Sequence, residues 1–487
     1  MKTSTSSPPG PTADKNRLAF LSLGVASFLA LFWFQVLDVP YWQDDYYYLL
    51  GAQQARLAGE PWFAPFFPAT KVTFWRPLGL EVYWRFVEGV LDGNSRSAHV
   101  VNILLLIAAA AAVGWFVSLL TKLLAPENDS PTAGLFAALL YGVHASHFLP
   151  VAWTAAANDS FAIFFSALTL GFWLKITTMP GRRALPAVLA VALFFSLALL
   201  SRDIAIVLPA LGLLLSVWLM PRYRPTAAAW GTGALCVLIA VGWLLLRDHF
   251  SLPSDPAYDL QFGFNVLRNT VALLLFAFNL PFEVLRFFFF VKPSAGIALW
   301  GLLSLVVQMA AFGLLLHAAR AQLNRKGLIL LALFFITGCG PAFLLSVNCY
   351  PYYTTLGLFS YAVIAGLATR QSRVVPMVLL LVLLSAALAT VGNFFLDSPS
   401  HVGRARWAER QLVRLEAMRA VQPALFTPPF ILAVEDDHRF LGFRAEGIAY
   451  RLGINLTDIE VREPAATAVL QRPVLVVPRD GDVYFTR

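Results

Sequence analysis

Apolar segments long enough to span a bilayer recur along this chain, and they limit its fold more strictly than any other feature. The first extends from Leu18 to Leu37, and the last ends at Val391. Hydrophobic residues make up 58% of the 487 residues and charged residues only 13%, which excludes a soluble globular protein. The sequence therefore predicts an all-α polytopic membrane bundle with about eleven transmembrane helices.

The basic residues between the apolar segments predict which side of the membrane each loop faces, because Lys and Arg concentrate in cytoplasmic loops. Residues 1–17 form an expected cytoplasmic tail. The segment that follows is too long for a signal peptide and lacks a small-residue cleavage site, so we expect an uncleaved anchor. The basic turns at 182–183 and 221–225 fall on the same side. We expect a multi-pass protein of the cell membrane, the inner membrane of a bacterium, with a cytoplasmic N-terminus.

One apolar block, from Phe264 to Val291, does not fit a single span. Pro281 and the charged residues Glu283 and Arg286 interrupt it in the middle. A single crossing would also place the basic segment 317–326 outside, against the charge rule. The sequence therefore predicts a re-entrant or interfacial pair that begins and ends outside.

Two regions are expected outside the membrane. Residues 38–97 form a large first external loop of short helices that lie in the interface. The composition changes past Asp397, and residues 397–487 are expected to form a small external α/β domain. Its expected elements are helices at Arg404–Met418 and Arg439–Leu452, a strand at Phe430–Val434, and a terminal hairpin of Val474–Val477 and Val483–Thr486 joined around Asp480 and Gly481.

Two adjacent carboxylates, Asp44 and Asp45, follow the first apolar segment and are flanked by aromatic residues. Carboxylates so close to each other and to lipid resist ionising together, which separates their pKa values. Such a pair is suited to general-base catalysis. The alternative is an aromatic interfacial belt with two solvated acids beside it, an arrangement that is common at membrane borders.

Further candidate side chains fall in separate external loops, which a bundle of packed spans would bring together. Ionisable residues at a membrane edge are functional candidates because each is costly to desolvate. The candidates are His147, Trp153, Asn158, Asp159, Arg202, Asp203 and Tyr350 to Tyr353. A shared site is the hypothesis. The alternatives are that His144 and His147 are satisfied polar residues within a bundle, and that Arg202 and Asp203 form a local ion pair.

The charge and the motifs narrow the range of ligands. The net charge of +8 is explained by topology and by anionic lipid headgroups, so no nucleic acid is expected. The sequence has no Gly-rich phosphate loop and no cluster of metal ligands, and its cysteines do not have the spacing of a metal site. We expect no cofactor and no metal. A divalent metal at the acidic pair is the alternative.

Three stretches of the chain combine into a recognisable pattern. They are Trp42-Gln-Asp-Asp-Tyr46, His144-Ala-Ser-His-Phe-Leu-Pro-Val-Ala-Trp153 with Ala157-Asn-Asp159, and Leu200-Ser-Arg-Asp203 before Pro209. The pattern resembles the integral-membrane glycosyltransferases of C-type fold that use polyprenyl-phosphate sugars, above all the dolichyl-phosphate-mannose protein mannosyltransferases and the transmembrane O-mannosyltransferases with tetratricopeptide repeats. The resemblance implies a transmembrane glycosyltransferase domain of C-type fold at residues 18–391, with the first acid of the pair as catalytic base.

Two positions depart from the pattern of that family. Cys349 stands where the family often has an arginine, and Ala157 stands at a second basic position. Both changes remove candidate phosphate contacts, which leaves Arg202 with more of that role. The tetratricopeptide repeats are also absent, so the resemblance implies no particular acceptor.

The residues and the resemblance lead to one functional hypothesis, the inverting transfer of a sugar from a polyprenyl-phosphate carrier to a hydroxyl of a protein, lipid or glycan acceptor on the external face. Asp44 is the expected base, and Asp45 or Asp159 holds the acceptor or tunes the pKa. Arg202 meets the charge that develops on the leaving phosphate. Weaker candidates for the phosphate are Arg76, Arg268 and Arg286, and the expected substrate-binding residues further include His147, Trp153, Tyr350 and Tyr352.

Two other classes of function stay open at this point. A transporter or lipid flippase would carry ionisable residues at mid-depth and inverted repeats, whereas the charges here lie at one membrane face and no repeat is visible. A non-enzymatic membrane assembly protein would bind partners through its external domain, and its loops would be inert.

Overall fold

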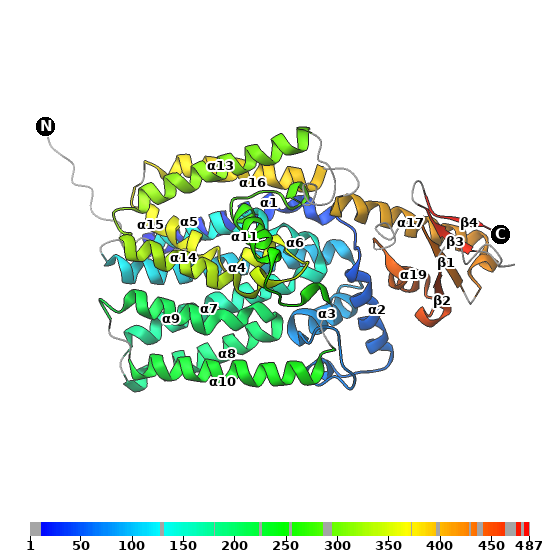
Figure 1. Cartoon of the computed structure of the whole chain (residues 1–487), viewed down its shortest axis with the longest axis horizontal. Coiled ribbons are helices and arrows are strands. Elements are labelled where there is room, and N and C mark those ends of the chain that lie inside the picture. The colour runs from blue at the N-terminus through cyan, green and yellow to red at the C-terminus, as the bar shows by residue number, and fades with distance from the viewer. Residues whose placement is uncertain are drawn as a thin grey trace.

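The computed structural model describes residues 11–126, 131–179, 181–223, 226–252, 256–285, 295–371, 373–395, 400–427, 430–435, 442–462, 474–478 and 482–486. Apolar helices lying side by side make up most of the molecule, and a small sheet with two helices projects from one end of the bundle (Figure 1). The chain is a multi-pass membrane protein. The expected all-α bundle followed by a small C-terminal α/β part is confirmed.

Seven helices among the described residues are long and apolar enough to cross a membrane, and the bent pair α5 and α6 makes an eighth if it is one span. The apolar helices are α1 Pro11–Phe32, α4 Ser95–Leu124, α5 Pro131–Gly142, α6 Phe148–Ala152, α7 Asn158–Thr178, α8 Leu185–Ser201, α9 Leu208–Leu219, α10 Ala227–Phe250, α11 Phe264–Ala277, α13 Ala295–Ala319, α14 Arg325–Cys339, α15 Phe359–Ala368 and α16 Val375–Phe395. A helix covers each of the expected spans.

Three of the expected spans fall on helices of fewer than 18 residues, namely α8, α9 and α15. The 12 residues of α9 and the 10 residues of α15 extend over less than a bilayer core, since each residue adds about 1.5 Å. Both helices are short because a 3-10 turn precedes them, at Asp203–Val207 and at Pro351–Thr354. These turns carry candidate site residues.

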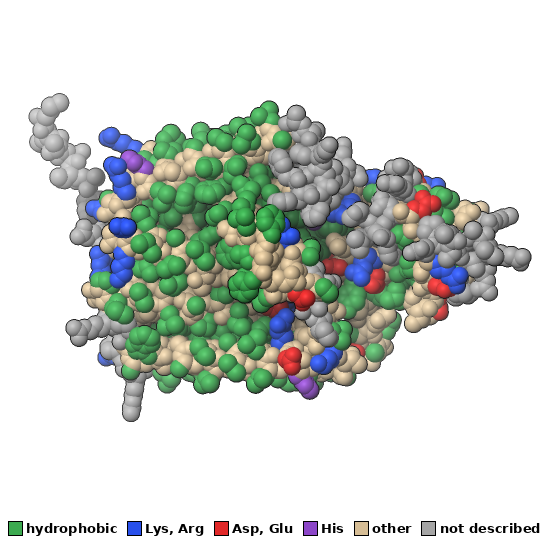
Figure 2. All heavy atoms as spheres, in the orientation of Figure 1, with side chains coloured by type: hydrophobic (Ala, Val, Ile, Leu, Met, Phe, Trp, Pro, Cys, Tyr) green, Lys and Arg blue, Asp and Glu red, His purple; other side chains and the backbone are tan. Residues whose placement is uncertain are grey.

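The face of the bundle in Figure 2 is largely apolar between two ends that carry charged side chains. Lys and Arg side chains gather at the end where the N-terminus lies (Figures 1 and 2). Large apolar side chains such as Leu189, Leu238 and Leu380 are exposed on the spans between the two ends. A surface of this kind is stable only against hydrocarbon, so it marks the part of the molecule that the bilayer covers.

The apolar block from Phe264 to Val291 is interrupted, as expected. Helix α11 ends at Ala277, and Asn279 follows with a positive φ of 58°. The Asn279 side chain then accepts a hydrogen bond from the backbone N–H of Ala145 at 2.9 Å, which ties the break to the segment between α5 and α6. The second half of the expected pair, residues 286–294 with Arg286, lies outside the described residues.

Short helices make up the loop between α1 and α4, as expected. They are α2 Asp44–Leu57, η2 Ala64–Phe66, η3 Pro77–Val82 and α3 Tyr83–Val90. Helices α2 and α3 lie at the end of the bundle that faces the C-terminal sheet (Figure 1). Trp62 and Phe67 are exposed in this loop, as is typical of segments at a membrane interface.

Among its described residues, the C-terminal part contains a four-stranded sheet in the order β2-β1-β3-β4 and two α-helices. Its elements are α17 His401–Val421, β1 Phe430–Val434, α19 Arg444–Leu452, β2 Ile459–Arg462, β3 Val474–Val477 and β4 Tyr484–Thr486. Strand β1 is parallel to β2 and β3, and β4 is antiparallel to β3 with Leu475 opposite Phe485. The expected terminal hairpin is confirmed, although Asp480 and Gly481 lie outside the described residues. Helix α19 begins at Arg444, and the expected start of this helix at Arg439 lies outside the described residues.

Candidate functional site

Arg202 follows the last residue of α8, in extended backbone. Its guanidinium lies 3.3 Å from Oδ1 of Asp159 and donates a hydrogen bond to Oδ1 of Asn158 at 3.0 Å, both in the first turn of α7. The guanidinium carbon is 4.3 Å from the centre of the Tyr352 ring, and the whole residue is only 5% exposed. Three predicted site residues, Arg202, Asp159 and Tyr352, therefore meet around one buried cation.

Asp203 pairs with a different arginine. Nη2 of Arg76 lies 3.0 Å from Oδ2 of Asp203, and Nη2 of Arg247 lies 3.6 Å from the same atom. Gly79 allows the loop that carries Arg76 to lie close to the end of α8, because a Cβ at this position would lie 2.6 Å from the last carbonyl oxygen of that helix. The structure thus contains two ion-pair networks side by side and not a local pair between Arg202 and Asp203.

A cavity of about 410 Å³ opens beside the two networks, and we call it the cationic cavity. Its charged lining consists of the guanidinium groups of Arg76, Arg202 and Arg247 and the carboxylates of Asp203 and Asp259. Its apolar lining includes Ile206, Trp243, Leu244, Leu260 and Leu345. Leu244 lies on the spanning helix α10 and is also exposed on the outer surface. The cavity therefore joins a cluster of guanidinium groups to the lipid-facing side of a span.

Asp45 is buried in the first turn of α2, and both of its carboxylate oxygens are engaged. Oδ2 accepts a hydrogen bond from the backbone N–H of Trp42 at 3.1 Å, and Oδ1 accepts one from Ala155 at 2.7 Å. Asp45 is only 1% exposed. This burial raises the pKa of Asp45 well above its ordinary value, although both hydrogen bonds oppose the shift. Asp45 therefore joins α2 to the turn that follows α6.

Asp44 makes its contact with the C-terminal part of the chain. Nη1 of Arg444, the first residue of α19, donates a hydrogen bond to Oδ1 of Asp44 at 2.9 Å. Burial raises the pKa of Asp44, and the positive charge of Arg444 opposes this shift. The Asp44 side chain remains 38% exposed, so it is the accessible member of the acidic pair.

The backbone is strained on both sides of the contact between Asp44 and Arg444. Gln43, before α2, has a φ of 55°, and Arg444 has a φ of 54°. The backbone N–H of Gln43 donates a hydrogen bond to the carbonyl oxygen of Gly442 at 2.9 Å. A positive φ is uncommon for such residues, and strain of this kind collects at functional sites where the surrounding structure enforces it.

Aromatic rings lie between the segment of the acidic pair and Arg202. The ring of Trp42, whose backbone N–H binds Asp45, lies 5.3 Å from the ring of Trp153. The Tyr350 ring stacks on Tyr352 with 5.1 Å between centroids, and Tyr352 lies against Arg202. Trp153 adds a ring 6.5 Å from Tyr350. One aromatic cluster thus extends from Trp42, beside the acidic pair, to the candidate phosphate-binding cation.

Two other candidates have contacts of a different kind. His147 is fully buried, and its ring packs against Tyr141 with 4.7 Å between centroids. Arg268 donates hydrogen bonds to backbone carbonyls in the segment after α14. Arg286 lies outside the described residues. The contacts of His147 and Arg268 hold the bundle and its loops in place.

Two arginines of the site were not among the candidates from the sequence. Arg247 ends the apolar helix α10, where a basic residue is ordinarily explained by topology. Arg444 lies 400 residues from its partner Asp44, and no pattern in the sequence connects the two positions. The position of Arg247 at a helix end could have identified it as a candidate from the sequence. The contact of Arg444 with Asp44 is visible only in the folded structure.

The described residues contain no group of three or more His, Cys, Asp or Glu side chains arranged to hold a metal ion. In the acidic pair, backbone N–H groups occupy both oxygens of Asp45, and Arg444 occupies one oxygen of Asp44. A divalent metal at this pair stays a prediction.

No family model matches the chain, and no curated protein matches it. Solved structures are similar in fold. The archaeal oligosaccharyltransferase AglB from Archaeoglobus fulgidus, in complex with an inhibitory peptide and a dolichol-phosphate, has a TM-score of 0.50 and 11% identity over 91% of this chain and 64% of that chain. This chain therefore spans less than two thirds of AglB.

ArnT from Cupriavidus metallidurans is also similar. Bound to undecaprenyl phosphate, it has a TM-score of 0.47 and 15% identity over 96% of this chain and 93% of that chain. In the apo state it has a TM-score of 0.47 and 16% identity over 95% of this chain and 93% of that chain. Together with the helical bundle and its small terminal sheet, the likeness to AglB shows that this chain has the C-type fold of the integral-membrane glycosyltransferases.

Proposed function

We propose that the protein transfers a sugar from a polyprenyl-phosphate carrier to an acceptor hydroxyl on the external face of the membrane, with inversion at the anomeric carbon. One observation carries this proposal, the combination of three guanidinium groups with the lipid-facing Leu244 in the wall of the cationic cavity. A phosphate joined to a long apolar chain needs both features in one place. The dolichol-phosphate in the AglB structure supports the same class of donor.

Arg202 is the cation best prepared to meet the phosphate. Asp159, Asn158 and the Tyr352 ring hold its guanidinium, so little side-chain freedom is lost when a ligand binds. The cavity also excludes much of the solvent around Arg202, and this strengthens its attraction for a negative charge. Charge on the phosphate grows as the glycosidic bond breaks, so Arg202 stabilises the transition state more than the bound donor.

Asp44 is the base in this proposal. The acceptor O–H gives its proton to the Asp44 carboxylate while the oxygen attacks the anomeric carbon. The bond from that carbon to the phosphate oxygen breaks, and the phosphate leaves with the electron pair. Exposure of 38% and a raised pKa suit Asp44 to this role, while Asp45, with both oxygens bound, positions the helix that carries it.

The orientation in the membrane belongs to the same proposal. The Lys and Arg side chains at the N-terminal end of the bundle support a cytoplasmic location of that end (Figure 2). The C-terminal sheet and the cationic cavity then face the external side, which in a bacterium is the periplasmic side of the inner membrane. A protein, lipid or glycan can supply the acceptor hydroxyl there.

Binding of two lipids to the full-length protein in nanodiscs tests the donor. Undecaprenyl phosphate and undecaprenol have the same tail and differ only in the phosphate, so native mass spectrometry of each complex isolates the contribution of the charge. We expect the wild type to prefer undecaprenyl phosphate and Arg202→Ala to show a weaker preference, because Arg76 and Arg247 still line the cavity. Arg414→Ala is the control, because Arg414 pairs with Asp482 on the exposed surface of the C-terminal part.

Equal retention of both lipids by the wild type would contradict the proposal. Lipids extracted from a deletion strain provide the test in the cell, where we expect a polyprenyl-phosphate sugar to accumulate. A transporter or flippase makes the opposite prediction for reconstituted vesicles, in which a labelled polyprenyl-phosphate sugar would change leaflets without cleavage. An assembly protein would do neither.

A further inference from the structure

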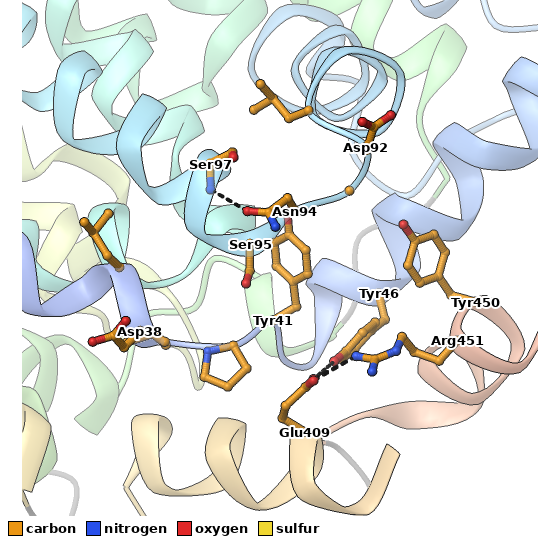
Figure 3. A pocket seen from close by; sticks show the side chains of 15 residues that line it. Asp38, Tyr41, Tyr46, Asp92, Asn94, Ser95, Ser97, Glu409, Tyr450 and Arg451 are labelled. Atoms are coloured by element: carbon orange, nitrogen blue, oxygen red, sulfur yellow. Dashed lines mark hydrogen bonds and ion pairs between the residues drawn. The ribbon is translucent and has the colours of Figure 1, made fainter. Parts of the chain in front are cut away.

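A second hollow lies where the C-terminal part of the chain meets the loop between α1 and α4 (Figure 3). Its volume is about 770 Å³, and we call it the acidic cleft. Tyr46 of α2 and residues 37–41, 91–95 and 97 form one wall, and Glu409 of α17 with Tyr450 and Arg451 of α19 form the other. None of the residues that line it also lines the cationic cavity.

The charge of the acidic cleft is opposite to that of the cationic cavity. Its carboxylates are Asp38, Asp92 and Glu409, and its cation is Arg451. Arg451 already binds Glu409 at 2.9 Å and Glu416 at 2.8 Å, so its charge is neutralised. Asp38 and Asp92 are exposed and form no ion pair with another described residue. The cleft therefore repels anions and is open to neutral or cationic ligands.

The uncharged lining groups are those that bind sugars. Hydroxyl groups come from Ser95, Ser97 and Tyr450, and an amide comes from Asn94. The ring of Tyr41 lies in the middle of the cleft between Asn94 and Tyr46 (Figure 3). Tyr41 is 6% exposed, and its hydroxyl has no hydrogen-bonding partner in the described part of the chain. Carboxylates and hydroxyls bind sugar hydroxyls, and aromatic rings pack against the C–H faces of sugars.

A fixed turn presents Asp92 to the cleft. Asp92 and Gly93 both have positive φ, 52° and 61°, a combination that Asp and Gly accept more readily than other residues. A Cβ on Gly93 would lie against the Tyr450 hydroxyl, so this turn packs closely on α19. The two walls of the acidic cleft are therefore held against each other before any ligand binds.

We propose that the acidic cleft binds a neutral or cationic carbohydrate, the acceptor or an extension of the acceptor in the transfer reaction. Helix α2 connects this cleft to the reaction, since Tyr46 lines the cleft and Asp44 lies two residues earlier on the same helix. The designation as acceptor rests on the proposed function, but the binding of carbohydrate does not. The two hollows would then sort the substrates by charge, with phosphate in the cationic cavity and an uncharged or cationic glycan in the acidic cleft.

A panel of neutral oligosaccharides, amino-sugar oligomers and uronic-acid oligomers tests this proposal with the full-length protein in nanodiscs. We expect binding of neutral or amino-sugar oligomers and no binding of uronic-acid oligomers. The Asp38→Asn/Asp92→Asn variant should weaken the binding of an amino-sugar oligomer by tenfold or more, because it removes two negative charges from a cleft that binds a cationic ligand. Both carboxylates are exposed, so their removal leaves the fold intact. Asn also tolerates the positive φ of residue 92.

Glu460→Gln is the matched control, since Glu460 is an exposed acid of the C-terminal sheet outside the cleft. An equal loss of binding in Glu460→Gln would overturn the proposal, because the effect would then come from net charge alone. Preferential binding of uronic-acid oligomers, or of a peptide library in place of every glycan, would overturn it as well. If no glycan binds to nanodiscs that still prefer undecaprenyl phosphate to undecaprenol, the cleft proposal fails and the donor proposal stands.

Discussion

Arg444 donates a hydrogen bond to Asp44 at 2.9 Å across 400 residues of sequence. This contact joins the C-terminal part of the chain to the candidate base, and the hydrogen bond from Gln43 to the carbonyl oxygen of Gly442 reinforces it. The sheet and its helices therefore take part in the candidate site, because one of their side chains contributes a positive charge beside Asp44.

The pH dependence of transfer should respond to Arg444. The positive charge of Arg444 lowers the pKa of Asp44 against the effect of burial, so Arg444→Gln should raise that pKa further. A base is active only when it is deprotonated, and the acid limb of the plot of kcat/KM against pH should therefore move to higher pH. Steady-state transfer rates over a range of pH values measure this shift.

Glu446→Gln is the matched control for this prediction. Glu446 lies on the same helix, and its negative charge raises the pKa of Asp44, so its removal should move the acid limb to lower pH. Burial remains the main cause of the raised pKa in both variants, while Arg444 and Glu446 act with opposite sign. Shifts in the same direction for the two variants would show that neither acts through the charge on Asp44.

Arg202 should matter more for turnover than for donor binding. Arg202→Ala should lower kcat by about two to three orders of magnitude, as is usual when a group that meets developing charge is lost from an enclosed site. Arg202→Lys should retain part of the rate, since it keeps the charge and loses the planar fork that contacts Asn158 and Asp159. Single-turnover transfer from a polyprenyl-phosphate sugar separates the two effects. A wild-type rate in Arg202→Ala would reduce the residue to a structural partner of Asp159.

Much of the bundle could be predicted from the sequence, because hydrophobic length alone determines where a helix can cross a bilayer. The interruption before Pro281 was equally predictable, since α11 ends at Ala277. The partners of the charged residues were not predictable. Arg202 and Asp203 are neighbours in sequence, yet the extended backbone at Arg202 directs the two side chains into separate networks. The packing of α7 and η3 against the end of α8 decides whether Arg202 and Asp203 pair with each other or with separate partners.

The orientation of the bundle predicts the outcome of reporter fusions. A reporter that is active only in the cytoplasm should work when fused after Arg183, Arg325 or Arg373, at the basic end of the bundle. It should fail when fused after Asp45 or Asp203. Activity measured in whole cells, normalised to the amount of fusion protein, gives the result. A cytoplasmic signal after Asp203 would invert the topology and place the cationic cavity on the cytoplasmic side.

The last prediction separates the two members of the acidic pair. Asp44→Asn preserves the shape of the side chain but removes the proton acceptor, so transfer should fall by about two to four orders of magnitude. The protein should still fold and bind undecaprenyl phosphate, because Asp44 is partly exposed and its amide oxygen can still accept from Arg444.

Asp45→Asn should instead act on stability. Both oxygens of Asp45 accept backbone hydrogen bonds, and an amide would turn its NH₂ group toward either Trp42 N–H or Ala155 N–H. A buried donor facing a donor costs roughly 1–3 kcal/mol, which should appear as a lower unfolding temperature of the nanodisc-embedded protein. Transfer by the folded fraction should change less than in Asp44→Asn. If transfer is lost in Asp45→Asn at unchanged stability and persists in Asp44→Asn, then the buried carboxyl is the base, and Arg444 holds a side chain that takes no part in the proton transfer.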